Sequence, residues 1–277
     1  MSQPTLELVC SQLGIPLEKM INLYVGGSRL YGCHHEKSDY DLFLIVHNDT
    51  TLPQVNNKEW VSMEDDNILL TTKEFDNTID TASMPKRSEN CISYRSDVFD
   101  VNIYKECQFT YELENYLDCS LFEYASLSHH DGSSPVKMQC TLLERKPYPI
   151  KPPSTPENKS DFRRPFSRKS SNSFVKCKKK LCVELDLMTG LKSMFHSMRI
   201  ISFAIQILKY GYIKQFDVAN EYFVDIMQYS NVSQDKYEEV WNILNTKYGE
   251  IRKKLEKEFH TLAPKIGLQK NQKKPKQ

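Results

Sequence analysis

The pattern of apolar and polar positions divides the chain into a first part of short elements and a second part of long helices. In the first part, residues 4–20 have helical spacing, and residues 21–25 are β-prone and end at two glycines. Residues 39–46 finish in the run Leu-Phe-Leu-Ile-Val, which is apolar on both faces and predicts a central, covered strand. Residues 98–104 predict a second strand, and residues 107–127 predict a helix with one apolar stripe.

A change of composition separates the two parts. Residues 147–169 contain six prolines and several serines, which predict a linker or an exposed loop. Helical spacing returns over residues 170–263, and residues 264–277 form a basic tail that we expect to be frayed. Residues 58–75 are compatible with a hairpin around Asp65-Asp66-Asn67. We therefore predict an α+β fold, with a small sheet domain over residues 1–146 followed by a linker and an α-helical domain.

Composition narrows the class of protein without naming a partner. The 37 basic and 36 acidic residues nearly cancel, so the chain has no strong overall field. No stretch approaches the ~18–20 apolar residues of a membrane span, and the first twenty residues lack the pattern of a signal peptide. The eight cysteines form no C-x-x-C pair, which favours free thiols in a reducing compartment. We expect a cytoplasmic protein that does not enter the membrane.

The candidate chemistry lies between residues 26 and 46. A turn with Gly27 and Ser28 offers backbone N–H groups to a phosphate, and it is followed by Asp39 and Asp41. Two residues apart on a strand, these carboxylates would point to one face. Asp100, on the second predicted strand, would join them if the two strands pair, and carboxylates so grouped suit Mg²⁺. The alternative is that they are solvated residues at a strand edge, which the apolar run after them disfavours.

Two stretches resemble the polymerase-β-like nucleotidyltransferase superfamily: G-S-R-L-Y-G at 27–32 and S-D-Y-D-L at 38–42. More narrowly, they are similar to the branch described as RNA-repair-associated predicted nucleotidyltransferases. D-V-N-I-Y-K at 100–105 resembles the third-carboxylate strand of that branch, and residues 191–199 resemble its basic helix with an H-x-x-R element.

This resemblance implies a mixed-sheet nucleotidyltransferase domain followed by helices. It also implies two Mg²⁺ ions held by Asp39, Asp41 and Asp100, and a nucleoside triphosphate donor, with ATP expected. The implied reaction transfers a nucleoside monophosphate to an acceptor hydroxyl, for which RNA is the expected source.

Other residues have two open interpretations each. Ser28 could cap the following helix and also bind a phosphate, and Arg29 could reach a phosphate or pair with a nearby acid. Lys192, His196 and Arg199 share one helical face. They could hold the triphosphate or the acceptor, or form an ordinary solvated face.

Residues 147–180 are rich in positive charge, with ten Lys or Arg and two acids. Phe162, Phe166 and Phe174 are interleaved, and such a composition can bind a nucleic-acid backbone and stack its bases. A solubilising loop has the same composition. Because they are expected on a helix, the better RNA-binding candidates are Lys176, Lys178, Lys179 and Lys180.

Two further functions fit the same residues. The enzyme could instead transfer a nucleotide to a protein side chain, as AMP-transferring antitoxins do. Alternatively, the chain could be a binding module that holds nucleotide or RNA without turnover.

Overall fold

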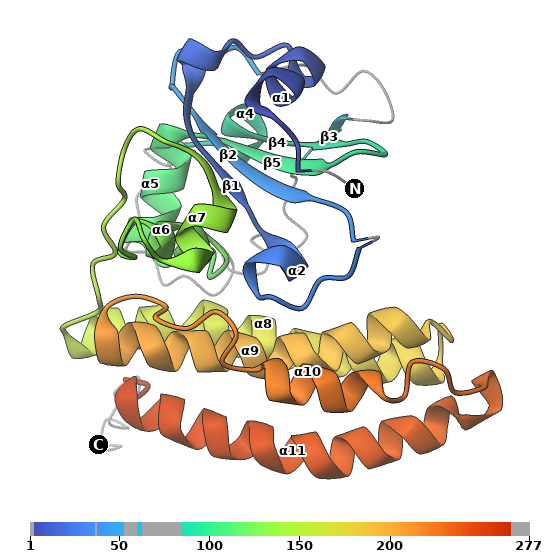
Figure 1. Cartoon of the computed structure of the whole chain (residues 1–277). Coiled ribbons are helices and arrows are strands. Elements are labelled where there is room, and N and C mark those ends of the chain that lie inside the picture. Colours follow the sequence, from blue (N-terminus) through green and yellow to red (C-terminus); the bar gives the residue numbers. More distant parts are fainter. Residues whose placement is uncertain (1–2, 37, 53–59, 63–84, 267–277) are drawn as a thin grey trace, which may run out of the picture. The chain divides into compact units, whose positions relative to one another are not determined.

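The computed structural model shows a sheet-containing unit and a helical unit (Figure 1). The predicted α+β fold, a sheet domain followed by helices, is confirmed. The residues described are 3–36, 38–52, 60–62 and 85–266. The first unit comprises Met1–Ile150 and Tyr212–Asn220, and the second comprises Lys151–Gly211 and Glu221–Gln277.

The sheet of the first unit has, within the described residues, six strands in the order β3-β4-β5-β2-β1-β6. Strands β2 and β5 run parallel, and every other neighbouring pair is antiparallel, so the sheet is mixed. The strands span Met20–Val25 (β1), Asp41–Val46 (β2), Trp60–Ser62 (β3), Cys91–Arg95 (β4), Asp100–Lys105 (β5) and Thr141–Glu144 (β6).

Strand β2 lies in the middle of the sheet, as its apolar run predicts, and its residues after Asp41 are buried. The ring of Phe43 stacks on Tyr124 with centroids 4.1 Å apart and on Tyr104 with centroids 5.0 Å apart. Phe109 lies 5.7 Å from the same ring. Helices α5 (Glu106–Glu114) and α6 (Leu121–Leu127), which carry Phe109 and Tyr124, therefore cover this face of the sheet.

Two helices predicted for the first unit are shorter than expected. The first, α1 (Leu6–Leu13), ends at Gly14, which adopts φ 64° and donates its N–H to Cys10 O at 2.9 Å. The single helix predicted over residues 107–127 is wrong, because the chain breaks between α5 and α6 and Tyr116 adopts φ 55°. The remaining helices of this unit are η1 (Leu17–Lys19), α2 (Gly27–Leu30), α4 (Arg87–Asn90) and α7 (Pro135–Cys140).

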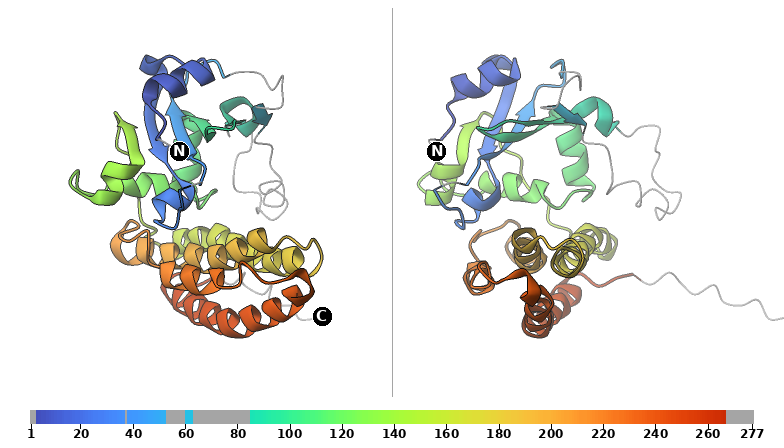
Figure 2. Two further views of the ribbon diagram at one scale, coloured as in Figure 1. Left: turned by 45° about the vertical axis from the view of Figure 1, so that its right-hand side comes forward. Right: turned by 90° about the vertical axis from the view of Figure 1, so that its right-hand side faces the viewer.

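The second unit consists of long helices, which the right-hand view of Figure 2 shows nearly end-on. Its core contains a cluster formed by Phe162, Phe166 and Phe259, with ring centroids 4.5 to 6.3 Å apart. The helices that follow the first unit are α8 (Pro156–Cys182), α9 (Leu187–Tyr210), α10 (Asn220–Met227), η3 (Gln234–Lys236) and α11 (Tyr237–Leu262).

The loop predicted over residues 147–169 is wrong from Pro156 onward, where α8 begins. Proline is well accommodated at the first helical position, since the N–H it lacks has no helical partner there, and Thr155 caps the helix. Only Pro165 lies inside the helix. Phe162 and Phe166 are fully buried, so they form core and do not offer exposed rings for stacking on bases.

Two further predictions fall on other parts of the chain. The hairpin around Asp65-Asp66-Asn67 lies outside the described residues, as does the tail from residue 267. None of the helices in the part of the chain described here combines the length and apolarity needed to cross a bilayer.

Candidate active site at the start of strands β2 and β5

A sharp turn joins β1 to α2, and its glycines are required by both backbone and packing. Gly27 adopts φ 59°, in the left-handed region that favours glycine. A Cβ atom at Gly27 would overlap Oδ2 of Asp41 and lie 2.7 Å from its Cγ, and one at Gly26 would overlap the hydroxyl of Tyr124. The Gly26 N–H also donates to Asp41 O at 2.7 Å. The turn is therefore packed directly against the Asp41 carboxylate.

The second carboxylate comes from the parallel neighbour of β2. Asp41 and Asp100 are register partners at the start of β2 and β5. Partners in a ladder point to the same face of a sheet, so the two side chains lie next to each other. The N–H of Asp100 donates to Tyr40 O at 2.9 Å, which ties the two strand starts together. The two strands that carry the predicted aspartates are therefore neighbours in the sheet, as the grouping of Asp100 with Asp41 requires.

Asp39 is exposed, between the buried Ser38 and Tyr40, and it lies before β2 and not on the strand itself. It is nevertheless close enough to act on the strand pair. Partial burial raises the pKa of the Asp100 carboxyl; the Arg95 guanidinium opposes this rise, and the negative charge of Asp39 adds to it. Asp39 and Asp100 therefore act on each other electrostatically.

Arg29 shapes the segment that carries Asp39. Its Nη2 donates to Ser38 O at 2.7 Å and its Nε donates to Asp39 O at 3.2 Å. The guanidinium lies 3.7 Å from the centroid of the Tyr40 ring. Arg29 therefore binds backbone carbonyls beside the acid, which neither of its two sequence-based interpretations included.

Ser28 occupies a different position from the one predicted. The cap of α2 is Gly26, without a side-chain hydrogen bond, and Ser28 lies within the first turn. The prediction that Ser28 is the N-cap is wrong, because the helix begins at Gly27, two residues earlier than a cap at Ser28 would allow. A role of Gly27 and Ser28 in binding phosphate stays a prediction.

The chemistry of the donor set fits Mg²⁺, a hard cation that prefers carboxylate oxygens. Asp41 and Asp100 place two such groups side by side, and Asp39 is near enough to perturb Asp100. A cation between like charges would relieve their repulsion. In the described part of the chain, no three His, Cys, Asp or Glu side chains are already gathered as a metal-binding cluster.

Asp41 and Asp100 form a row of register partners across the sheet, and sequence reasoning missed the polar groups that continue this row onto β4. Arg95 is the register partner of Asp100, and Ser93 is the partner of Asn102. Polar residues alternate with buried apolar ones in both strands, so the signal was present in the segments Ile92–Arg95 and Asp100–Ile103. It could be interpreted only once the pairing of β4 with β5 was known.

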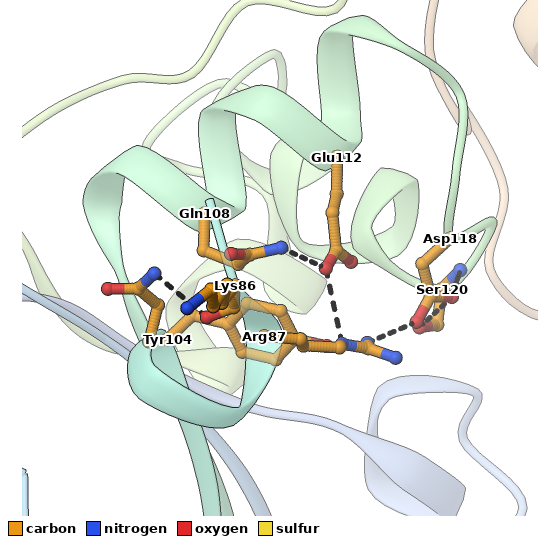
Figure 3. A network of polar contacts seen from close by, with 8 residues as sticks. Lys86, Arg87, Tyr104, Gln108, Glu112, Asp118 and Ser120 are labelled. Atoms are coloured by element: carbon orange, nitrogen blue, oxygen red, sulfur yellow. Dashed lines mark hydrogen bonds and ion pairs between the residues drawn. The ribbon is translucent and has the colours of Figure 1, made fainter. Parts of the chain in front are cut away.

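Farther along β5, a buried ionic cluster anchors the strand to α4 and α5 (Figure 3). Nε of Arg87 lies 3.2 Å from Oε1 of Glu112, and its Nη2 lies 3.2 Å from Oδ2 of Asp118. The same guanidinium hydrogen-bonds the hydroxyl of Tyr104 on β5. Burial opposes the positive charge of Arg87 and would lower its pKa, but Tyr104, Glu112 and Asp118 outweigh this effect and raise the pKa of the guanidinium. The cluster fixes β5, and with it the start of the strand, against its covering helices.

The residues proposed on the basic helix lie on α9 of the second unit. Lys192 is exposed, whereas Arg199 is buried and donates from Nη2 to Nδ1 of His196 at 2.7 Å. Burial, and then the charge of Arg199, hold the pKa of His196 well below its usual range. Because a guanidinium can only donate, Nδ1 of His196 carries no proton in this contact and the ring is neutral. The alternative of an ordinary solvated face is wrong, since Arg199 is buried. Phosphate binding by these residues stays a prediction.

The four candidate RNA-binding lysines are on α8. Lys179 and Lys180 both pair with Glu184, at 2.7 and 2.5 Å, and they lower the pKa of that carboxyl to about 2. Part of their charge is thereby neutralised within the helix end. Lys176 and Lys178 are exposed. RNA binding by this set stays a prediction, now centred on the latter two.

No protein-family model matches this chain, and a comparison with curated proteins finds no match either.

Proposed function

We propose that this protein is a Mg²⁺-dependent nucleotidyltransferase that moves a nucleoside monophosphate from a nucleoside triphosphate to an acceptor hydroxyl of RNA. The observation that carries the proposal is the pairing of Asp41 with Asp100 beside a glycine turn that packs against Asp41. The resemblance of residues 27–32 and 38–42 to the polymerase-β-like superfamily supports the same conclusion.

In this proposal the residues of the chain bind and orient the reactants. The turn from Gly26 to Ser28 receives the triphosphate, because Gly26 and Gly27 have no side chains and allow close approach to the backbone. Asp39, Asp41 and Asp100 hold the Mg²⁺ ions, which when bound supply positive charge for the phosphates and the departing pyrophosphate.

The reaction is a substitution at the α-phosphorus. The acceptor oxygen forms a bond to that phosphorus, while the bond from it to the oxygen of the β-phosphate breaks and pyrophosphate leaves. The Asp100 carboxylate accepts the hydrogen bond of the attacking hydroxyl, orients it and takes up its proton as the new bond forms.

The test uses the four nucleoside triphosphates, each labelled at the α-phosphate, with total RNA and total protein as acceptors. We expect labelled RNA, ATP being the favoured donor, and release of pyrophosphate. Asp39→Ala and Asp41→Ala should each lower the rate about a hundredfold or more, because ion binding supplies several kcal/mol to such transition states.

A matched control keeps the interpretation specific. Asp97 is exposed in the bend just before β5, so Asp97→Ala removes the same charge near the site but outside the row. It should retain activity, and circular dichroism should show all variants folded. Undiminished turnover in both Asp39→Ala and Asp41→Ala would refute the proposal.

Other outcomes would select the competing functions. Label on protein and not on RNA would identify a protein-modifying enzyme. Tight RNA binding without turnover, unaffected by Asp41→Ala, would identify a binding module. A cytoplasmic location belongs to the proposal, since all eight cysteines are free thiols in the structure.

A further inference from the structure

The end of β4 and the starts of β5 and β2 form one polar row across the sheet. Arg95 on β4, Asp100 on β5 and Asp41 on β2 are successive register partners, so their side chains share a face. The glycine turn packs against Asp41 at one end of the row. Arg95 lies at the other end and is exposed. The row therefore has two different sides, separated by the pair of carboxylates.

A second pair extends the Arg95 side of the row along the strands. The Ser93 hydroxyl donates to Oδ1 of Asn102 at 2.6 Å. Asn102 is an exposed residue, and this bond fixes its amide so that Nδ2 is directed away from Ser93. The surface beyond Asp100 thus offers N–H donors and one positive charge from Arg95.

The order of the row assigns the two reactants to its two sides. In an in-line transfer the attacking oxygen and the leaving group lie on opposite sides of the phosphorus. If the triphosphate occupies the glycine turn, the acceptor approaches from the side of Asp100 and Arg95. Donor-rich, positively charged surfaces bind phosphates and other anionic oxygens.

We propose that Arg95, with Asn102, binds the phosphate of the 3′-terminal nucleotide of an RNA acceptor and so presents its 3′-hydroxyl to Asp100. This assignment rests on the proposed nucleotidyltransferase function and names its acceptor side. Only the ribose separates the 3′-hydroxyl of a nucleotide from its own 5′-phosphate, and neighbouring strands are about 4.8 Å apart. A serine or tyrosine hydroxyl of a protein has no such anion beside it, so the row favours RNA.

The first test measures binding in the absence of Mg²⁺. Fluorescence anisotropy of a 5′-fluorescein single-stranded RNA with a free 3′-hydroxyl gives the affinity over a range of salt concentrations. Arg95→Ala should weaken binding about tenfold, and it should reduce the slope of log K against log salt by about 0.7, the value for one phosphate contact of a single strand. Asn102→Asp keeps the acceptor for Ser93 but removes the donor, and it should also weaken binding.

Arg145 provides the matched control. It is exposed and directly follows β6, the strand at the edge of the sheet remote from β4. Arg145→Ala removes the same charge from the same unit and should leave both affinity and slope unchanged. A fluorescent ATP analogue should bind Arg95→Ala as tightly as the wild type, because Arg95 lies on the acceptor side.

Transfer of labelled nucleotide to the same RNA separates the two proposals. If the wild type transfers nothing but binds RNA with an Arg95-dependent slope, the proposed function fails and the RNA-binding role of Arg95 stands. If transfer occurs and Arg95→Ala binds and reacts like Arg145→Ala, the acceptor assignment is overturned and the proposed function stands. Label on protein alone would also overturn the acceptor assignment.

Discussion

Replacing Gly27 by alanine tests two requirements at this position in the turn after β1: a left-handed backbone conformation and space beside the Asp41 carboxylate. A left-handed φ costs a residue with a Cβ about 1–2 kcal/mol. The new methyl group would also displace the Asp41 carboxylate, since it would lie 2.7 Å from Cγ and 3.0 Å from Cβ of that residue. Overpacking of this kind costs about 1–3 kcal/mol. We therefore expect Gly27→Ala to lower the free energy of unfolding by about 2–5 kcal/mol.

Gly14→Ala isolates the backbone contribution. Gly14 has nearly the same φ, 64°, and a Cβ there would meet no atom within 4 Å. It should lose only about 1–2 kcal/mol. The gain from a less flexible unfolded chain is the same for both variants and cancels in the comparison. Urea unfolding followed by circular dichroism measures each value.

A double-mutant cycle identifies the contact itself. In the Asp41→Ala background, most of the clash at Gly27 disappears and only the 3.0 Å contact with Cβ remains. Gly27→Ala should therefore cost about 1–2 kcal/mol less in that background than in the wild type. Equal losses for the Gly27 and Gly14 variants, with no coupling to Asp41, would refute the conclusion that the turn packs against the carboxylate.

Three further predictions concern buried polar groups of the first unit. Arg87→Ala leaves Glu112 buried without its cation, so it should lower the free energy of unfolding by about 3–5 kcal/mol in urea titrations; a loss below ~1 kcal/mol would contradict the cluster. Asn22→Leu removes the acceptor of two backbone N–H groups and a donor to Lys146 O, so about 3 kcal/mol should be lost, and a neutral result would argue against these bonds. His129 accepts the N–H of Ile150 at 3.1 Å, and burial lowers its pKa; the stability it contributes is present above the unfolded pKa of about 6.5 and is lost as pH falls below that value. His129→Gln keeps an acceptor that does not titrate. The melting temperature of this variant should therefore fall less between pH 7 and pH 5 than that of the wild type, and identical profiles would refute the role of His129.

The strands that carry the carboxylates could be predicted because their signals are local. The run after Asp41 is long and apolar enough to mark a central strand, and Asp100 starts a second strand with alternating burial. The expectation that these two strands are neighbours came from a resemblance and not from periodicity, since no local pattern shows which strand pairs with which. The parallel register of β2 and β5 is a tertiary fact.

Other parts of the site depend on contacts distant in sequence. Arg95 becomes part of the row only through the pairing of β4 with β5. The neutral state of His196 follows from its burial and from Arg199, which donates to its ring. Only the first part of α8, residues 156–169, was expected to be a loop, because proline was counted without its position. Pro156 begins the helix, and the buried Phe162 stabilises it through packing.

The return of residues 212–220 to the first unit has a practical consequence for dissecting the protein. The Ile213 N–H donates to the Ser126 hydroxyl at 3.0 Å, His130 donates to Ile213 O at 2.8 Å, and Asn220 donates to Tyr31 O at 2.7 Å. A gene truncated after codon 150 would encode a fragment without these partners, exposing a surface normally covered by Ile213. Residues 151–211 of the helical unit thus interrupt the sheet unit in sequence, whereas residues 221–277 follow it. A minimal fragment of the sheet unit would need an artificial connection from residue 150 to residue 212.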